Sequence, residues 1–125
     1  MEFDSPYVNL RIKNKILVGT YKKNLRINLE VAKAIVRARI SFTGKQPMPS
    51  LIMSQGVISI DKPARDYLSS AEATEGLTAS AIIVNSPFST FLGNFFMAVN
   101  KTHMPVKLFS NTAKAEKWLQ QFIEN

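Results

Sequence analysis

Residues 79–84, Ala-Ser-Ala-Ile-Ile-Val, run directly into Asn85-Ser86-Pro87, and this junction decides the fold class. A short apolar run without alternation predicts a strand that is buried on both faces. Ser86 is a favourable N-cap and proline is favoured at the first helical position, so a helix begins there. A doubly buried strand followed at once by a helix indicates a parallel sheet with helices on its faces.

The helix predicted after Ser86 ends at Lys101 and has a strongly aromatic face. That face consists of Phe88, Phe91, Leu92, Phe95, Phe96 and Val99. Residues 106–109 form the next apolar run, and Ser110 or Asn111 then caps a final helix. Apolar residues on that helix are Ala115, Trp118, Leu119, Phe122 and Ile123.

The N-terminal part begins with a predicted β-hairpin. Residues 8–13 alternate apolar and polar side chains, as a half-buried strand does. Asn14-Lys15 is a tight turn, and residues 16–21 form the returning strand. Residues 22–26, Lys-Lys-Asn-Leu-Arg, form the turn into the first helix, which runs from the Asn28 N-cap to about Phe42.

Between this helix and residue 79, the sequence predicts a strand over 49–53 and a connection over 56–61. Pro63 then opens a helix that continues to Leu68. The predicted order is β-β-α-β-α-β-α-β-α in one domain over residues 1–125. We therefore expect an α/β fold with a mixed, mostly parallel sheet of about five strands and right-handed crossovers.

The composition excludes several kinds of chemistry. The chain has no cysteine and its one histidine is His103, so we expect no metal site and no cofactor. Glycine-rich nucleotide loops and nucleophile-elbow motifs are absent from the sequence. Asp61 and Asp66 could form an acid/base pair, but a helix cap and an exposed helical residue explain them better. We therefore expect that the protein is not an enzyme.

Partners and location follow from charge and hydropathy. The net charge of +7 resides in residues 1–50, which hold ten Lys/Arg and three Asp/Glu. Tyr21 is the single aromatic residue in the basic cluster around the hairpin, so nucleic-acid binding is not favoured. The acidic N-terminus predicts no signal peptide, and polar breaks at residues 85–87 and 93–94 argue against a transmembrane segment. We expect a cytoplasmic protein.

The helix over 28–42 has two apolar stripes. Residues predicted to face the sheet are Val31, Ala34, Ile35, Ala38 and Phe42. Leu29, Val36 and Ile40 form a second stripe, nearly opposite. A second apolar stripe is covered either by a loop of the same chain or by a second subunit. An exposed row of three apolar residues predicts a contact with a protein partner or a second copy of the chain.

The element order resembles that of the STAS domains, the sulfate-transporter and anti-sigma-factor-antagonist domains. Residues 54–61, Ser-Gln-Gly-Val-Ile-Ser-Ile-Asp, lead into a helix as in that family, and residues 79–125 extend the likeness. The chain looks like a divergent bacterial STAS-like (SpoIIAA-like) protein. The resemblance implies a SpoIIAA-like fold and a regulatory role.

Antagonist STAS domains carry a phosphorylatable serine in an Asp-Ser-Ser/Thr-Gly pattern at the start of this helix. Asp61 matches the aspartate, but Lys62 and Pro63 follow, and Pro63 stands where the switch serine would be. The resemblance therefore implies a degenerate switch position.

Two functions are compatible with the sequence. The first is a non-catalytic binding or regulatory module that acts through protein–protein contacts at Leu29, Val36 and Ile40. The alternative is a domain that binds an apolar small molecule or lipid beneath the aromatic helix, against Phe88, Phe91 and Phe95.

Overall fold

The computed structural model describes residues 2–44, 46–84, 90, 93 and 104–123. The strands within them are β1 (Glu2–Asp4), β2 (Val8–Lys13), β3 (Ile16–Tyr21), β4 (Leu25–Ile27), β5 (Met48–Met53), β6 (Val57–Ile60), β7 (Leu77–Ile83) and β8 (Val106–Phe109). The helices are α1 (Leu29–Thr43), α2 (Lys62–Leu68) and α4 (Thr112–Leu119), and the 3₁₀ turn η1 (Gln120–Phe122) follows α4.

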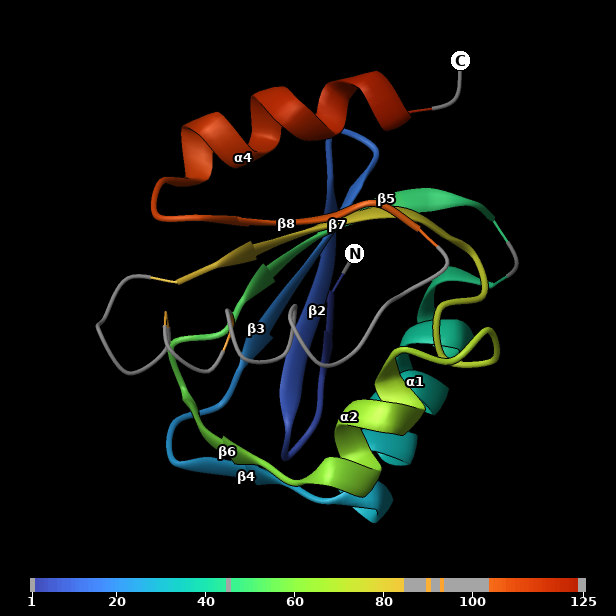
Figure 1. Ribbon diagram of the computed structural model, residues 1–125. Helices are drawn as coiled ribbons and strands as arrows, with labels where there is room; N and C mark the ends of the chain where they lie inside the picture. Colours follow the sequence, from blue (N-terminus) through green and yellow to red (C-terminus); the bar gives the residue numbers. More distant parts are fainter. Residues whose placement is uncertain (1, 45, 85–89, 91–92, 94–103, 124–125) are drawn as a thin grey trace.

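The main sheet has six strands in the order β1-β2-β3-β5-β7-β8 (Figure 1). β1, β2 and β3 pair antiparallel, and β3, β5, β7 and β8 pair parallel. The predicted hairpin and the predicted mixed sheet are confirmed. The sheet exceeds the expected five strands because residues 2–4 add an edge strand, with Phe3 opposite Leu10.

A second, two-stranded parallel sheet joins β4 to β6 (Figure 1). The prediction that residues 22–26 are only a turn and residues 56–61 only a connection was therefore wrong. β4 and β6 are each too short to show a hydrophobic period. Their pairing also joins segments about thirty residues apart, so no local pattern reveals it. β4 leads into α1 and β6 leads into α2, so this small sheet sets the two helix starts beside each other.

Side-chain caps begin the helices where local rules predict. Asn28 Oδ1 accepts a hydrogen bond from the Val31 amide at 2.9 Å, and Asp61 Oδ1 accepts one from the Ala64 amide at 3.0 Å. Asn111, one of the two predicted candidates, caps α4 by accepting from the Lys114 amide at 3.0 Å.

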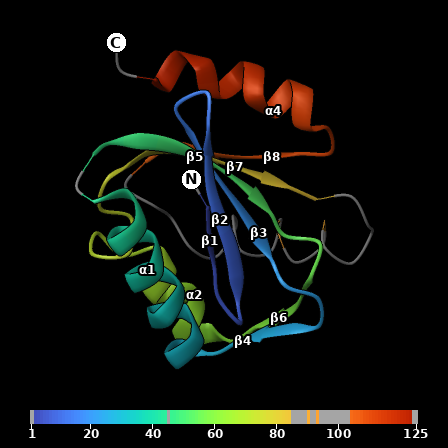
Figure 2. The ribbon, with the colours of Figure 1, turned by 180° about the vertical axis from the view of Figure 1, so that it is seen from behind.

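Helices cover both faces of the main sheet, with α1 and α2 on one side and α4 on the other (Figure 2). Successive side chains along each strand point to opposite faces of the sheet. Val8, Leu10 and Leu17 pack in the core under α1, whereas Val18 and Leu51 pack in the core under α4. The expectation that the 79–84 strand is buried on both faces is confirmed, since Ser80 and Ala81 face opposite sides and are both buried.

The helix predicted over 86–101 falls almost wholly outside the described residues. In the part of the chain that the structure describes, no helix has the length and hydropathy needed to cross a bilayer.

Candidate functional site

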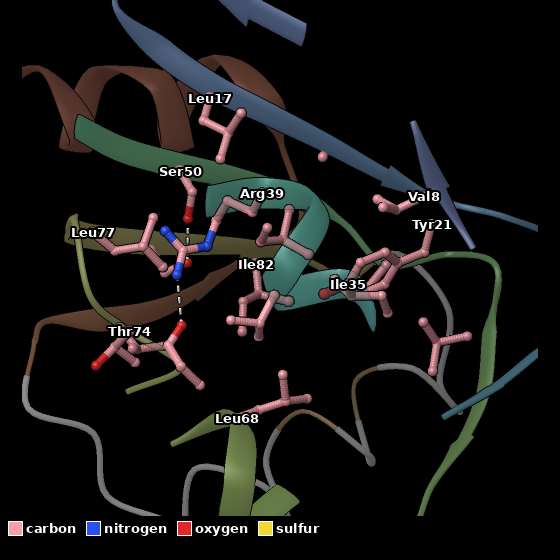
Figure 3. Close-up of a pocket in the computed structure, with 18 of the residues that line it drawn as sticks. Val8, Leu17, Tyr21, Ile35, Arg39, Ser50, Leu68, Thr74, Leu77 and Ile82 are labelled. Carbon is pink, nitrogen blue, oxygen red and sulfur yellow. Dashed lines mark hydrogen bonds between the residues drawn. The ribbon is translucent and has the colours of Figure 1, made fainter. Parts of the chain in front are cut away.

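A cavity of about 180 Å³ lies between the main sheet and the helices α1 and α2 (Figure 3). Strands β2, β3, β5 and β7 form its floor and α1 forms one wall. Most of its surface is aliphatic, and the apolar lining includes Val8, Leu10, Leu17, Ile35, Val36 and Ile82. An engineered cavity of about 150 Å³ with a similar lining stays dry and accepts benzene, so this space is large enough for a small apolar molecule.

Gly19 explains part of this space. It lies in the middle of β3 and lines the cavity, where neighbouring strands carry leucine and isoleucine. A Cβ atom at this position would meet Ile52 Cδ1 and Leu10 Cδ2, each at 3.5 Å, which is ordinary van der Waals contact. The glycine therefore leaves room for a Cβ atom that the sequence does not supply.

Arg39 is the charged residue among the described residues that line the cavity. It lies in the fourth turn of α1, is 8% exposed, and reaches the loop after α2. Its Nη1 donates to the Glu75 carbonyl at 2.8 Å and its Nη2 donates to the Ala73 carbonyl at 2.7 Å. Burial lowers the pKa of Arg39 from its ordinary value, while Tyr21 and Glu75 act in the opposite direction.

Two serines face the cavity from adjacent central strands. Ser50 of β5 pairs with Ser80 of β7 in the parallel register, and their hydroxyl oxygens are 2.5 Å apart. Both side chains are buried. One hydroxyl donates to the other, so the accepting hydroxyl keeps its own proton for a further acceptor.

Tyr21, at the end of β3, supplies another hydroxyl to the lining. Burial raises the pKa of Tyr21 to about 12, and the nearby positive charge of Arg39 opposes this only in part. Tyr21 is therefore neutral at physiological pH. In Figure 3, Arg39, Ser50 and Thr74 lie toward one end of the cavity, and Val8 and Tyr21 lie toward the other.

The predicted interface on α1 does not form an exposed row. Val36 is 4% exposed and lines the cavity, and Ile40 is half-buried. Leu29 alone of the three is exposed, at 37%. The expectation that Val36 points outward was wrong because α2 and the loop after it also pack against α1, so this helix is covered on two sides by its own chain.

The degenerate switch position lies on the surface at the start of α2. Asp61, Lys62 and Pro63 are exposed, and Asp61 serves as the helix cap. Asp61 and Pro63 also border a shallow groove with Asn28, the N-cap of α1, and with Leu29, Glu30 and Lys33 of that helix. Asp66, considered as a partner of Asp61, instead pairs with Lys62 at 2.8 Å.

The candidate apolar ligand face, Phe88, Phe91 and Phe95, lies outside the described residues, as does His103. Over the described ranges, no group of three or more acidic or histidine side chains is arranged to hold a metal ion.

Sequence reasoning missed the residues that give the cavity its polarity. Arg39 follows Ile35 by four residues and Val36 by three, a spacing that places it on their face of the helix. That signal was available in the sequence. Nothing local indicates that Ser50 and Ser80 meet, because their contact depends on the pairing of β5 with β7.

Comparisons with known proteins identify the fold. A family model described as "Domain of unknown function (DUF7793)" matches residues 10–123. No curated protein matches the chain. The crystal structure of an uncharacterised protein of the DUF3478 family from Shewanella loihica PV-4, described as having a SpoIIAA-like fold, superposes with a TM-score of 0.59 at 15% identity. The superposition covers 94% of this chain and 98% of that one, and it confirms the expected SpoIIAA-like fold.

Proposed function

The chain belongs to the DUF7793 family of domains of unknown function, and we propose that it is a non-catalytic binding domain whose cavity holds a small apolar molecule. The observation that carries this proposal is the aliphatic cavity of about 180 Å³ between the main sheet and α1. Protein interiors are ordinarily packed with few voids larger than a water molecule. A cavity of this size, with few polar groups, favours an apolar occupant over water.

A contact with a protein partner or a second copy stays a prediction. The row of Leu29, Val36 and Ile40 no longer supports it, because Val36 faces the interior. The cavity instead supports the alternative expectation of an apolar ligand, although the residues that line it differ from the predicted aromatic face.

The test uses octanol, a neutral molecule with eight carbons. Burial of about eight carbons at about 0.8 kcal/mol each contributes about 6 kcal/mol, and the cost of association removes much of it, so we expect weak binding with a dissociation constant in the millimolar range. Octanol should shift the methyl NMR resonances of Leu10, Leu17 and Ile35 while leaving those of Val18 and Leu51, on the other face of the sheet, in place.

Two variants on the same helix make the test specific. Val36→Phe replaces a small side chain with a phenyl ring that fills part of the cavity, and it should weaken octanol binding at least tenfold. Leu29→Phe adds the same ring at an exposed position of α1 and should leave binding unchanged. The proposal fails if octanol shifts neither set of methyl groups, or if both variants bind it like the original chain.

A further inference from the structure

We propose that the ligand of this cavity is an apolar acid, with its carboxylate at Arg39 and its hydrocarbon part against the aliphatic lining. This inference rests on the proposed function and specifies the chemical class of the ligand. It follows from the charge, hydrogen bonding and placement of the polar groups in the cavity wall.

The first observation is that Arg39 is a buried cation and that the carboxylate of Glu75 acts on it only from beyond ion-pair distance. Among the described residues it forms no ion pair, and the two acceptors that it contacts are neutral carbonyls, of Ala73 and Glu75. Its guanidinium has five N–H groups and two of them are used in these contacts. A cation removed from water is costly unless an anion and further acceptors compensate it.

The second observation is that further donor capacity lies at the same end of the cavity. The Ser50–Ser80 pair leaves one hydroxyl proton without an acceptor in the described part of the chain. Figure 3 shows Ser50 and Arg39 together toward that end, with Val8 and Tyr21 toward the other. A carboxylate accepts several hydrogen bonds and pairs with the fork of a guanidinium, so it matches these donors.

The third observation concerns size and shape. The volume of about 180 Å³ is below the usual range of about 300–1,000 Å³ for pockets that hold drug-sized molecules. It suits a hydrocarbon part of about eight carbons rather than a whole phospholipid. A medium-chain carboxylic acid combines this length with one charged end.

The experiment compares three ligands that share one chain length: octanoate, octanol and octylamine. At neutral pH, titration calorimetry of the intact protein should give octanoate at least tenfold tighter binding than octanol. Octylamine, a cation, should bind more weakly than octanol because it would meet the charge of Arg39.

Arg39→Met tests the residue itself. Methionine keeps much of the apolar stem and removes the charge, and apolar replacement of a buried ionic group is often tolerated. The variant should bind octanol as before, and octanoate should lose its advantage. Arg39→Lys keeps a positive charge but lacks the paired N–H groups of the guanidinium. This variant should retain only part of the preference for octanoate over octanol.

The outcomes separate the two proposals. Binding of none of the three ligands would overturn the proposed function. Equal binding of octanoate and octanol to the original chain would overturn the acid-binding proposal alone. If Arg39→Met does not fold, the affinities of the original protein still test the acid-binding proposal, which requires octanoate to bind most tightly and octylamine most weakly.

Discussion

At the scale of single residues, backbone conformation at the turns follows directly from local chemistry. Asn14 and Lys15 connect β2 to β3 with φ values of 52° and 65°. Two consecutive residues with positive φ are what a type I′ hairpin turn requires, and asparagine tolerates this region better than most residues. The hairpin was predictable because its register depends on residues adjacent in sequence.

Gly56 shows a close approach that sequence alone could not reveal. A Cβ atom there would lie 2.1 Å from the carbonyl oxygen of Lys22, a backbone atom that cannot simply rotate away. The Leu25 amide also donates to the Gly56 carbonyl at 2.9 Å, so the same contact aligns β4 with β6.

We therefore expect Gly56→Ala to lower the free energy of unfolding by about 1–3 kcal/mol, as overpacking does, in urea denaturation. Gly19→Ala is the matched control, because its Cβ meets only side-chain atoms at 3.5 Å. It should leave stability unchanged or raise it by up to about 1 kcal/mol. Equal stability of the two variants would contradict the close backbone contact at Gly56.

At the scale of elements, the buried surface of α1 is wider than predicted, since it includes Ile35 of the predicted sheet-facing side and also Val36 of the second stripe. Val36 and Leu29 are both apolar, yet the first is 4% exposed and the second 37% exposed. This contrast allows the assignment to be tested with one substitution at two positions.

Val36→Lys should destabilise the protein by about 3 kcal/mol or more, because it buries an unpaired charge near Arg39. Leu29→Lys should change stability by less than about 0.5 kcal/mol, as exposed substitutions usually do. Thermal unfolding followed by circular dichroism measures both. A stable Val36→Lys protein would mean that this position faces solvent and would restore the predicted surface stripe.

At the scale of the whole molecule, the cavity links stability to alkaline pH through Tyr21. Burial raises the pKa of Tyr21 from 10.0 to about 12 in the folded protein. The unfolded chain ionises first, so the stabilising contribution is fully present below pH 10 and is lost as the pH rises to about 12.

The loss attributable to Tyr21 should be roughly 2–3 kcal/mol, from about 1.4 kcal/mol per pKa unit. Tyr21→Phe has no ionisable group and should lose that much less stability than the original chain between pH 10 and 12. Urea denaturation at several pH values measures the difference. Parallel losses in both proteins would show that the Tyr21 hydroxyl is accessible to water.

Features that depend on residues close together in sequence were predicted correctly, and features that depend on distant residues were not. Helix starts at Asn28 and Asp61 were predictable because a cap bonds an amide three residues away. The β4–β6 sheet was missed because its strands of three and four residues are too short to show a hydrophobic period and pair across distant parts of the sequence. The cavity was not predicted either. Its proposed occupant, an apolar small molecule, nevertheless belongs to the ligand class that the sequence analysis gave as its alternative function.

The sequence by itself determined the α/β class, the hairpin and most helix limits, because hydrophobic period, caps and turn residues act over a few positions. The SpoIIAA-like fold was expected from the resemblance to the STAS domains. The tertiary structure alone decided that Val36 is covered, that Ser50 meets Ser80, and that Gly19 lies between Leu10 and Ile52 in the cavity lining. These features depend on which segments pack against α1 and how strands far apart in sequence pair. The apolar run predicted the burial of residues 79–84, but the burial of Val36 depends on α2 and the loop after it, which no local pattern specifies.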